Sequence, residues 1–137
     1  MEKYNYPMRL NLARGLIGLV ILWNLQVAFV FLLRPEQYTD AYELGGLAGA
    51  AALRGIGVLF LMWNVPYLVA LWHPVRHRIS LYEALAMQTI GLVGEAFIYL
   101  ALPVIHIALR ASVIRFIAFD ALGLGLLLIA VWITRQE

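Results

Sequence analysis

The chain has 137 residues, of which 64% are hydrophobic and 13% are charged, and its mean hydropathy is +0.84. A soluble domain is about half apolar and about a quarter charged, so this composition excludes an ordinary soluble fold and predicts an integral membrane protein. The formal net charge of +2 is too small to indicate a nucleic-acid partner. The absence of cysteine excludes disulfides, thiolate metal sites and iron–sulfur clusters.

Four apolar stretches are each long enough to cross a bilayer as a helix, which takes about 20 residues. They cover residues 12–33, 47–72, 79–102 and 112–134. The connections between them use most of the remaining length, so we expect one integral membrane domain over residues 1–137. The predicted fold is an all-α bundle of four antiparallel transmembrane helices in up-down order.

The first stretch is bounded by polar residues on one side and by proline on the other. Before it, Lys3 and Tyr4 suit the headgroup region of a membrane. After it, Pro35 ends the helix because proline has no N–H donor and restricts the residue before it. The segment PEQYTDAYEL then has proline first, acids in its first turn and Gly45-Gly46 as a stop. This order predicts a short amphipathic helix on the membrane surface.

The second stretch repeats the pattern of the first. RGLIGLVILWN begins at Arg14, and RGIGVLFLMWN begins at Arg54. The two helices run antiparallel, and ten residues rise by about 15 Å along a helix. Asn24 and Asn64 are therefore expected at the same depth, near the middle of the membrane.

The third stretch, residues 79–102, carries Glu83, Gln88 and Glu95. A carboxylate inside a bilayer costs several kcal/mol unless it faces protein or water, so both glutamates are expected to face the interior of the bundle. Gln88 lies at the depth of the two asparagines. Glu83 lies near the level of Arg14, which predicts a structural ion pair between Arg14 and Glu83.

The fourth stretch brings Arg115 and Asp120 to the level of Arg54 and Glu95. Two arginines and two acids would form a neutral cluster, and ionisable residues inside a membrane are functional by default. The central amides also have a purely structural interpretation as interhelical hydrogen bonds. The candidate binding residues are Arg54, Glu95, Arg115, Asp120, Gln88, Asn64 and Asn24.

Lysine and arginine outside the four stretches are distributed unevenly between the two predicted sides of the membrane. The side that holds both termini has five of them, and the other side has two. The five are Lys3, Arg9, Arg76, Arg78 and Arg135, and the two are Arg34 and Arg110. The positive-inside rule then places both termini in the cytoplasm of a multi-pass protein of the cell membrane.

Several features together resemble the DoxX-like superfamily of small four-helix bacterial membrane proteins. They are the Arg14-Gly15 start of the first stretch, Pro35 just after it, the glycine-rich segment from Gly45 to Gly57, and the acid-bearing third stretch. The resemblance implies a four-helix bundle in the bacterial inner membrane. It also implies, for some members, association with quinone-linked oxidoreductases, but it carries over no catalytic residues.

The leading functional hypothesis is a cavity, open to the outer leaflet, that binds a lipophilic molecule with a polar head, such as a quinone, an isoprenoid or a lipid. Its expected aromatic walls are Trp23, Trp63, Phe97, Tyr99, Phe116 and Phe119.

Three alternatives remain open on the sequence alone. One is an intramembrane acid/base isomerase or cyclase of terpenoid lipids, with Glu95 or Asp120 as the proton donor. Another is an oligomeric transporter or channel, and a third is a subunit of a larger membrane complex. Membrane lipids are the expected partners, with a homodimer or a larger complex left open. No metal site is predicted from the residue spacing, and no cofactor is expected.

Overall fold

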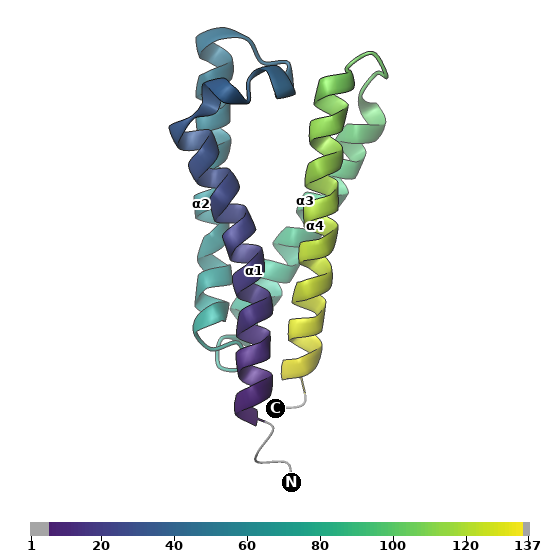
Figure 1. Ribbon diagram of the computed structural model, residues 1–137. Helices are drawn as coiled ribbons and strands as arrows, with labels where there is room; N and C mark the ends of the chain where they lie inside the picture. The colour runs from purple at the N-terminus through teal and green to yellow at the C-terminus, as the bar shows by residue number, and fades with distance from the viewer. Residues whose placement is uncertain (1–5, 136–137) are drawn as a thin grey trace.

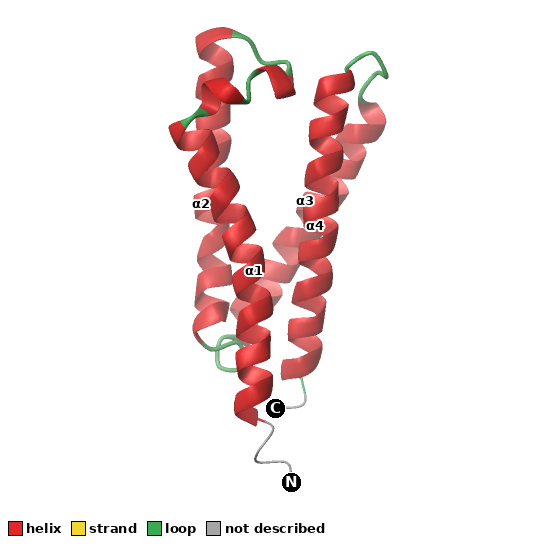
Figure 2. Ribbon diagram, viewed as in Figure 1, coloured by secondary structure: helices red, strands yellow, loops and turns green. Residues whose placement is uncertain are grey.

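The structure is a computed structural model that describes residues 6–135. Lys3 and Tyr4 lie outside the described residues. The long helices are α1 (Tyr6–Leu33), α2 (Gly46–Trp72), α3 (Arg78–Ala101) and α4 (Ile107–Thr134), and two short 3-10 helices, η2 (Pro35–Gln37) and η3 (Asp40–Tyr42), precede α2. Helices and loops make up the whole of this range (Figure 2). The predicted all-α class is therefore confirmed.

All four long helices of residues 6–135 are long and apolar enough to cross a membrane. The outward-facing positions carry large apolar side chains, among them Leu22, Phe29 and Met62, which are about half exposed or more. Exposed apolar faces on every long helix suit a lipid environment and are costly in water. The architecture thus indicates a multi-pass membrane protein.

Two predicted helix starts were wrong. α1 begins at Tyr6 rather than at residue 12, and α4 begins at Ile107 rather than at residue 112. In α1 the polar residues before the apolar stretch continue the helix, and Pro7 fits its first turn because no N–H donor is needed there. Hydropathy locates only the lipid-facing part of a helix, so helical turns that extend beyond the apolar stretch are missed.

The segment between α1 and α2 was predicted as a single short helix, and this detail was also wrong. It forms the two 3-10 turns η2 and η3, and Pro35 opens the first of them. Glu43 then adopts a left-handed backbone with φ of 54°, and Gly46 has φ of 69°. Glycine suits such a conformation because it has no Cβ to clash. The two reversals turn the chain into α2.

The bundle consists of two helical hairpins, α1–α2 and α3–α4, that meet at one end and diverge toward the other (Figure 1). The start of α1 and the end of α4 lie at the closed end, which we call the narrow end; η2 and η3 lie at the opposite, wide end (Figure 1). The hydrophobic core belongs to the narrow half, where small alanines allow close packing. Its fully buried members include Ala13, Ile17, Leu81, Ala84, Leu127 and Ala130.

Candidate functional site

Three neighbouring cavities occupy the wide half of the bundle. The α1–α4 cavity, of about 310 Å³, lies between these two helices and η3. The central cavity is smaller, about 110 Å³. The α2–α3 cavity, of about 270 Å³, lies on the other side of the bundle.

The three cavities form a series across the bundle because they share walls. Val27, Phe116 and Phe119 line both the α1–α4 cavity and the central cavity. Asn24, Phe60 and Asp120 line both the central cavity and the α2–α3 cavity. The α2–α3 cavity also reaches the lipid-facing surface, since its lining residues Leu59, Ile90 and Ile98 are each at least 50% exposed.

A chain of buried hydrogen bonds links three helices beside these cavities. The Tyr67 hydroxyl donates to Gln88 Oε1 over 2.6 Å. The Gln88 amide nitrogen donates to Asp120 Oδ1 over 2.9 Å and to the Asp120 backbone carbonyl over 3.3 Å. Tyr67 and Gln88 are almost completely buried. Because the Tyr67 hydroxyl donates to the amide oxygen of Gln88, the amide nitrogen is directed toward Asp120. Its hydrogen bond to Asp120 fixes the Asp120 carboxyl group in the cavity wall.

Two glycines make this close contact between α3 and α4 sterically feasible. A methyl group added at Gly91 would lie 2.6 Å from Asp120 Oδ2, and one added at Gly123 would lie 2.7 Å from Gln88 Nε2. Both separations are shorter than van der Waals contact allows. The hydrogen-bonded pair therefore depends on glycine at each of these positions.

Glu95 is the second acid of the site. It lines the α2–α3 cavity together with Asp120, and the two carboxyl groups interact electrostatically. Its Oε2 atom is buried and has no hydrogen-bond partner in the described part of the chain. A buried polar atom without a partner is costly, and the great majority of such atoms in proteins are paired. Glu95 thus places in the cavity wall a carboxyl oxygen that is available to a hydrogen-bond donor.

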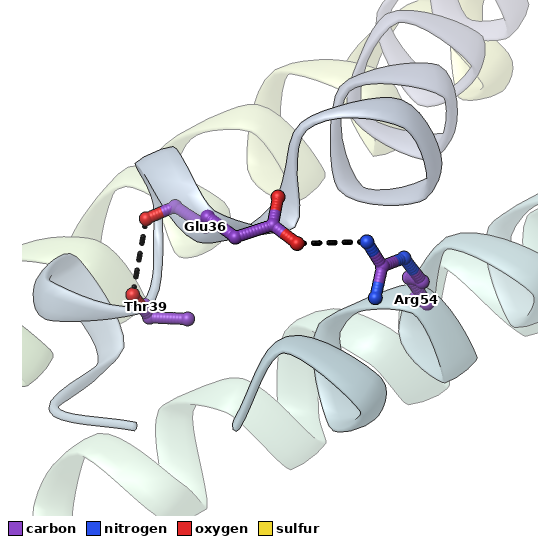
Figure 3. A network of polar contacts seen from close by, with 3 residues as sticks. All are labelled: Glu36, Thr39 and Arg54. Carbon is purple, nitrogen blue, oxygen red and sulfur yellow. Dashed lines mark hydrogen bonds and ion pairs between the residues drawn. The ribbon is translucent and has the colours of Figure 1, made fainter. Parts of the chain in front are cut away.

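The predicted neutral cluster of two arginines and two acids was wrong. Arg54 instead forms an ion pair with Glu36 of η2 at 2.7 Å, and the Thr39 hydroxyl donates to the Glu36 backbone carbonyl at 3.1 Å (Figure 3). Arg115 donates to the Ala111 carbonyl and to Ser112 Oγ. Spacing along a helix gives the relative height of its residues and shows which of them share a face. It does not show which face of the helix is turned toward the interior of the bundle.

The predicted ion pair between Arg14 and Glu83 was wrong as well. Arg14 donates instead to the backbone carbonyl of Trp72, at the end of α2, where carbonyls lack helical partners. Glu83 is exposed and lines a separate shallow groove with Pro66 and Ser80. Neither residue contributes to the three cavities.

The two asparagines of the repeated pattern lie in different environments. Asn24 lines the central and the α2–α3 cavities. Asn64 is fully buried, and its amide nitrogen donates to the Phe60 carbonyl of its own helix over 2.7 Å. Asn64 lines none of the three cavities. The structure therefore retains Asn24 and removes Asn64 from the candidate site.

The aromatic walls match the expectation in part. Trp23, Trp63, Phe116 and Phe119 line the cavities. Phe97 is 73% exposed, and Tyr99 stacks under the Arg110 guanidinium, 4.1 Å from its ring centroid. Sequence reasoning missed Phe31, Tyr38, Tyr42, Phe60 and Tyr67. Phe60 and Tyr67 had a usable signal, because each lies one helical turn from Trp63 on the same face.

Contacts at the wide end connect η3 with α4. Glu43 pairs with His106 at 2.5 Å and accepts the Leu109 N–H at 3.4 Å, while Ser112 donates to the Ala41 carbonyl over 2.6 Å. The hydrogen bond from His106 lowers the pKa of Glu43 below its ordinary value. Burial raises the pKa of Tyr42 to about 12, and the nearby Arg115 opposes this shift. These contacts fasten η3 over the α1–α4 cavity.

Comparisons with known proteins leave the site to be interpreted from its own residues. No family model, curated protein or solved structure matches the chain.

Proposed function

We propose that the chain is a multi-pass membrane protein whose bundle binds a lipophilic small molecule of the quinone, isoprenoid or lipid type. The polar group of this molecule would contact Glu95, Asp120 and Asn24, where the central and α2–α3 cavities meet. The observation that carries the proposal is that two carboxyl groups line one cavity whose other walls are mostly apolar. Small-molecule sites commonly combine apolar walls with a few polar groups that fix orientation.

The chemistry of the junction favours a ligand that donates hydrogen bonds. Carboxylates accept hydrogen bonds, and the Asn24 amide both donates and accepts. Asp120 already accepts from Gln88, whereas Glu95 Oε2 lacks a partner. A hydroxyl group, such as that of a quinol or a prenyl alcohol, would meet this requirement of Glu95. Trp63 and Phe60 in the same wall would stack on a flat ring, an arrangement that contributes about 0.5–1.5 kcal/mol.

The proposal includes an orientation in the membrane. Both termini would lie in the cytoplasm, and η2 and η3 would lie at the opposite membrane surface. The cavities would then open toward the outer leaflet, and a lipophilic ligand would enter sideways from the lipid. The resemblance to the DoxX-like superfamily suggests a role beside a quinone-linked oxidoreductase of the inner membrane. Reporter fusions at each terminus test the orientation, which requires both to be cytoplasmic.

Tryptophan fluorescence in lipid nanodiscs provides the test of binding. Trp23 and Trp63 line the cavities, and Trp72 and Trp132 are exposed. Titration with decylubiquinone should give saturable quenching, and geranylgeraniol, whose hydroxyl can donate to Glu95, should compete with the quinone. In Glu95→Gln the dissociation constant of geranylgeraniol, measured by this competition, should rise about tenfold, because its hydroxyl no longer donates to a carboxylate, and a hydrogen bond to a charged group contributes about 1.5–3 kcal/mol.

Glu83→Gln is the matched control, since Glu83 is an exposed acid of the same helix outside the three cavities. It should bind geranylgeraniol and decylubiquinone like the wild type. Linear, unsaturable quenching in all three proteins would mean that the quinone only partitions into the lipid, and the proposal would fail.

A second candidate function is intramembrane acid/base catalysis on a terpenoid lipid. It is favoured by the different surroundings of the two acids, because Gln88 donates to Asp120 whereas Glu95 Oε2 has no partner. Neighbouring carboxyl groups in unlike environments are the usual arrangement for separate acid and base roles. Mass spectrometry of prenyl lipids should then show a species that disappears on deletion of the gene and is not restored by Glu95→Gln. An unchanged lipid profile excludes this function.

A further inference from the structure

Arg115, at the wall of the α1–α4 cavity, forms no ion pair with an acid in the part of the chain that the structure describes. Its hydrogen bonds go to two uncharged oxygens, the Ala111 carbonyl at 3.3 Å and Ser112 Oγ at 3.0 Å. The ion pairs of residues 6–135 are Arg54 with Glu36 and His106 with Glu43. Glu36 and Glu43 of the α1–α2 connection are therefore already paired, its third acid, Asp40, is exposed, and neither ion pair includes Arg115.

The remaining donors of Arg115 match a specific kind of partner. A guanidinium has five N–H donors, and the two hydrogen bonds leave three of them without a protein acceptor in the described chain. The planar group binds carboxylate or phosphate through two parallel hydrogen bonds, which are stronger than bonds between neutral groups. The three remaining N–H donors of Arg115 are thus suited to an anion with two or more oxygens.

The rest of the cavity is unsuited to a small inorganic ion. Aromatic rings pack around it: between ring centroids, Phe31 lies 5.7 Å from Tyr38 and 5.6 Å from Tyr42, and Tyr42 lies 6.2 Å from Phe116. The wall is continued by Val27 and Val30. An anion bound to Arg115 would therefore have an apolar body attached to it, since aromatic walls gain most by covering apolar surface.

The geometry points to an anionic subsite in the α1–α4 cavity, in which Arg115, held in place by its hydrogen bond to Ser112, binds the carboxylate or phosphate end of an amphiphile. The apolar body follows the shared wall of Phe116 and Phe119 into the central cavity. Asp120 lies five residues, or about 7.5 Å, further along α4. This inference rests on the proposed function and narrows its ligand to a lipophile with an anionic end, whose other polar group reaches the Glu95–Asp120 junction.

Three probes with the same apolar body test the subsite: radiolabelled farnesyl phosphate, farnesoic acid and farnesol, bound to the protein in phosphatidylcholine nanodiscs. The wild type should bind at least one of the two anions tenfold or more tightly than farnesol. The stronger anion identifies the head group as phosphate or carboxylate. In Arg115→Gln the three affinities should become equal, and in Arg115→Lys a preference for the anion should persist.

Arg34→Gln is the matched control, because Arg34 is an exposed arginine at the same end of the bundle and lines none of the three cavities. It should keep the full preference for the anion. Retained farnesol binding by Arg115→Gln shows that this variant is folded.

Two outcomes overturn the inference and differ from failure of the proposed function. Equal affinity of the wild type for all three probes means that Arg115 recognises no ligand anion. An equal loss of preference in Arg34→Gln and Arg115→Gln means that the charge of the whole surface, not the subsite, attracts the anion. In both cases saturable farnesol binding would leave the proposed function intact, whereas absence of saturable binding by any probe or by decylubiquinone would remove both.

Discussion

Among single residues, Gln88 is held tightly because both ends of its amide are hydrogen-bonded. Tyr67 donates to one end, and Asp120 accepts from the other. Interhelical hydrogen bonds in membranes contribute about 0.6 kcal/mol on average, although a buried polar atom left unpaired costs about 1–3 kcal/mol. The chain through Gln88 therefore fixes the position of Asp120 more than it stabilises the fold.

Replacing Tyr67 tests this interpretation. Tyr67→Phe leaves Gln88 Oε1 buried without a donor, so we expect the free energy of unfolding to fall by about 1 kcal/mol. Decylubiquinone affinity should also fall, because the amide is then free to rotate away from Asp120. Tyr82→Phe on the half-exposed face of α3 is the control and should change neither quantity. Unfolding can be followed by helical circular dichroism during titration with dodecyl sulfate. An unchanged affinity in Tyr67→Phe would show that Asp120 needs no positioning.

The glycines of α3 allow a second comparison at the same scale. A Cβ atom at Gly91 would lie 2.6 Å from Asp120 Oδ2, whereas one at Gly94 would meet nothing within 4 Å. Both positions line the α2–α3 cavity. Gly94→Ala should raise the free energy of unfolding by up to about 1 kcal/mol through helix propensity. Gly91→Ala should lower it and weaken decylubiquinone binding, because the Asp120 carboxyl must move. Equal effects of the two alanines on stability and binding would contradict the close packing of α3 on Asp120.

At the scale of helices, hydropathy predicted α2 and α3 to within one residue at each end, and it missed the first turns of α1 and α4. The missed turns contain residues such as Arg9 and Arg110, which lower the hydropathy without stopping a helix. Depth along each helix was also predictable, since the rise per residue is fixed at about 1.5 Å. Glu95 and Asp120 accordingly line one cavity, in keeping with their predicted common level, and Gln88, predicted at the level of the asparagines, lines it as well.

The direction of each side chain around its helix was not predictable. α1, α2 and α4 are apolar on all sides, and such a helix carries no stripe that identifies the face turned inward. Arg54 was therefore assigned to the interior, but it reaches out to Glu36. Asn24 and Asn64, although equivalent in the repeated pattern, differ in whether they line a cavity. The directions of these side chains depend on how the hairpins pack, and the sequence pattern does not encode this packing.

The short element η3 should respond to alkaline pH through Tyr42. Burial raises the pKa of Tyr42 to about 12 from an ordinary value of 10. Folding therefore favours the neutral phenol: this contribution to stability is fully present below pH 10 and is lost as the pH rises toward 12. The unfolding midpoint of the wild type should fall over this range more than that of Tyr42→Phe, measured at intervals between pH 8 and 12. Parallel curves for the two proteins would mean that Tyr42 is not buried under η3.

For the whole molecule, the uneven packing of the two hairpins predicts uneven mobility. The buried core lies in the narrow half, whereas cavities separate the hairpins in the wide half. Regions with few buried apolar contacts open at lower free energy than a packed core. We therefore expect the α1–α2 and α3–α4 hairpins to move apart and together at the wide end, about the narrow end as a fixed base, and a ligand that contacts both hairpins to hold them together.

Distances between pairs of spin labels test this expectation, and the absence of native cysteine leaves introduced cysteines as the only labelling sites. Leu33 and Val104 are exposed at the wide end, and Met8 and Trp132 are exposed at the narrow end. The Leu33→Cys/Val104→Cys pair should give a broad distance distribution that narrows when decylubiquinone is added. The Met8→Cys/Trp132→Cys pair should give a narrow distribution that the ligand leaves unchanged, because the packed core holds these helices together. Distributions of equal width at the two ends would mean that the wide end is as rigid as the core, and the cavities would then have to admit a ligand without movement of the hairpins.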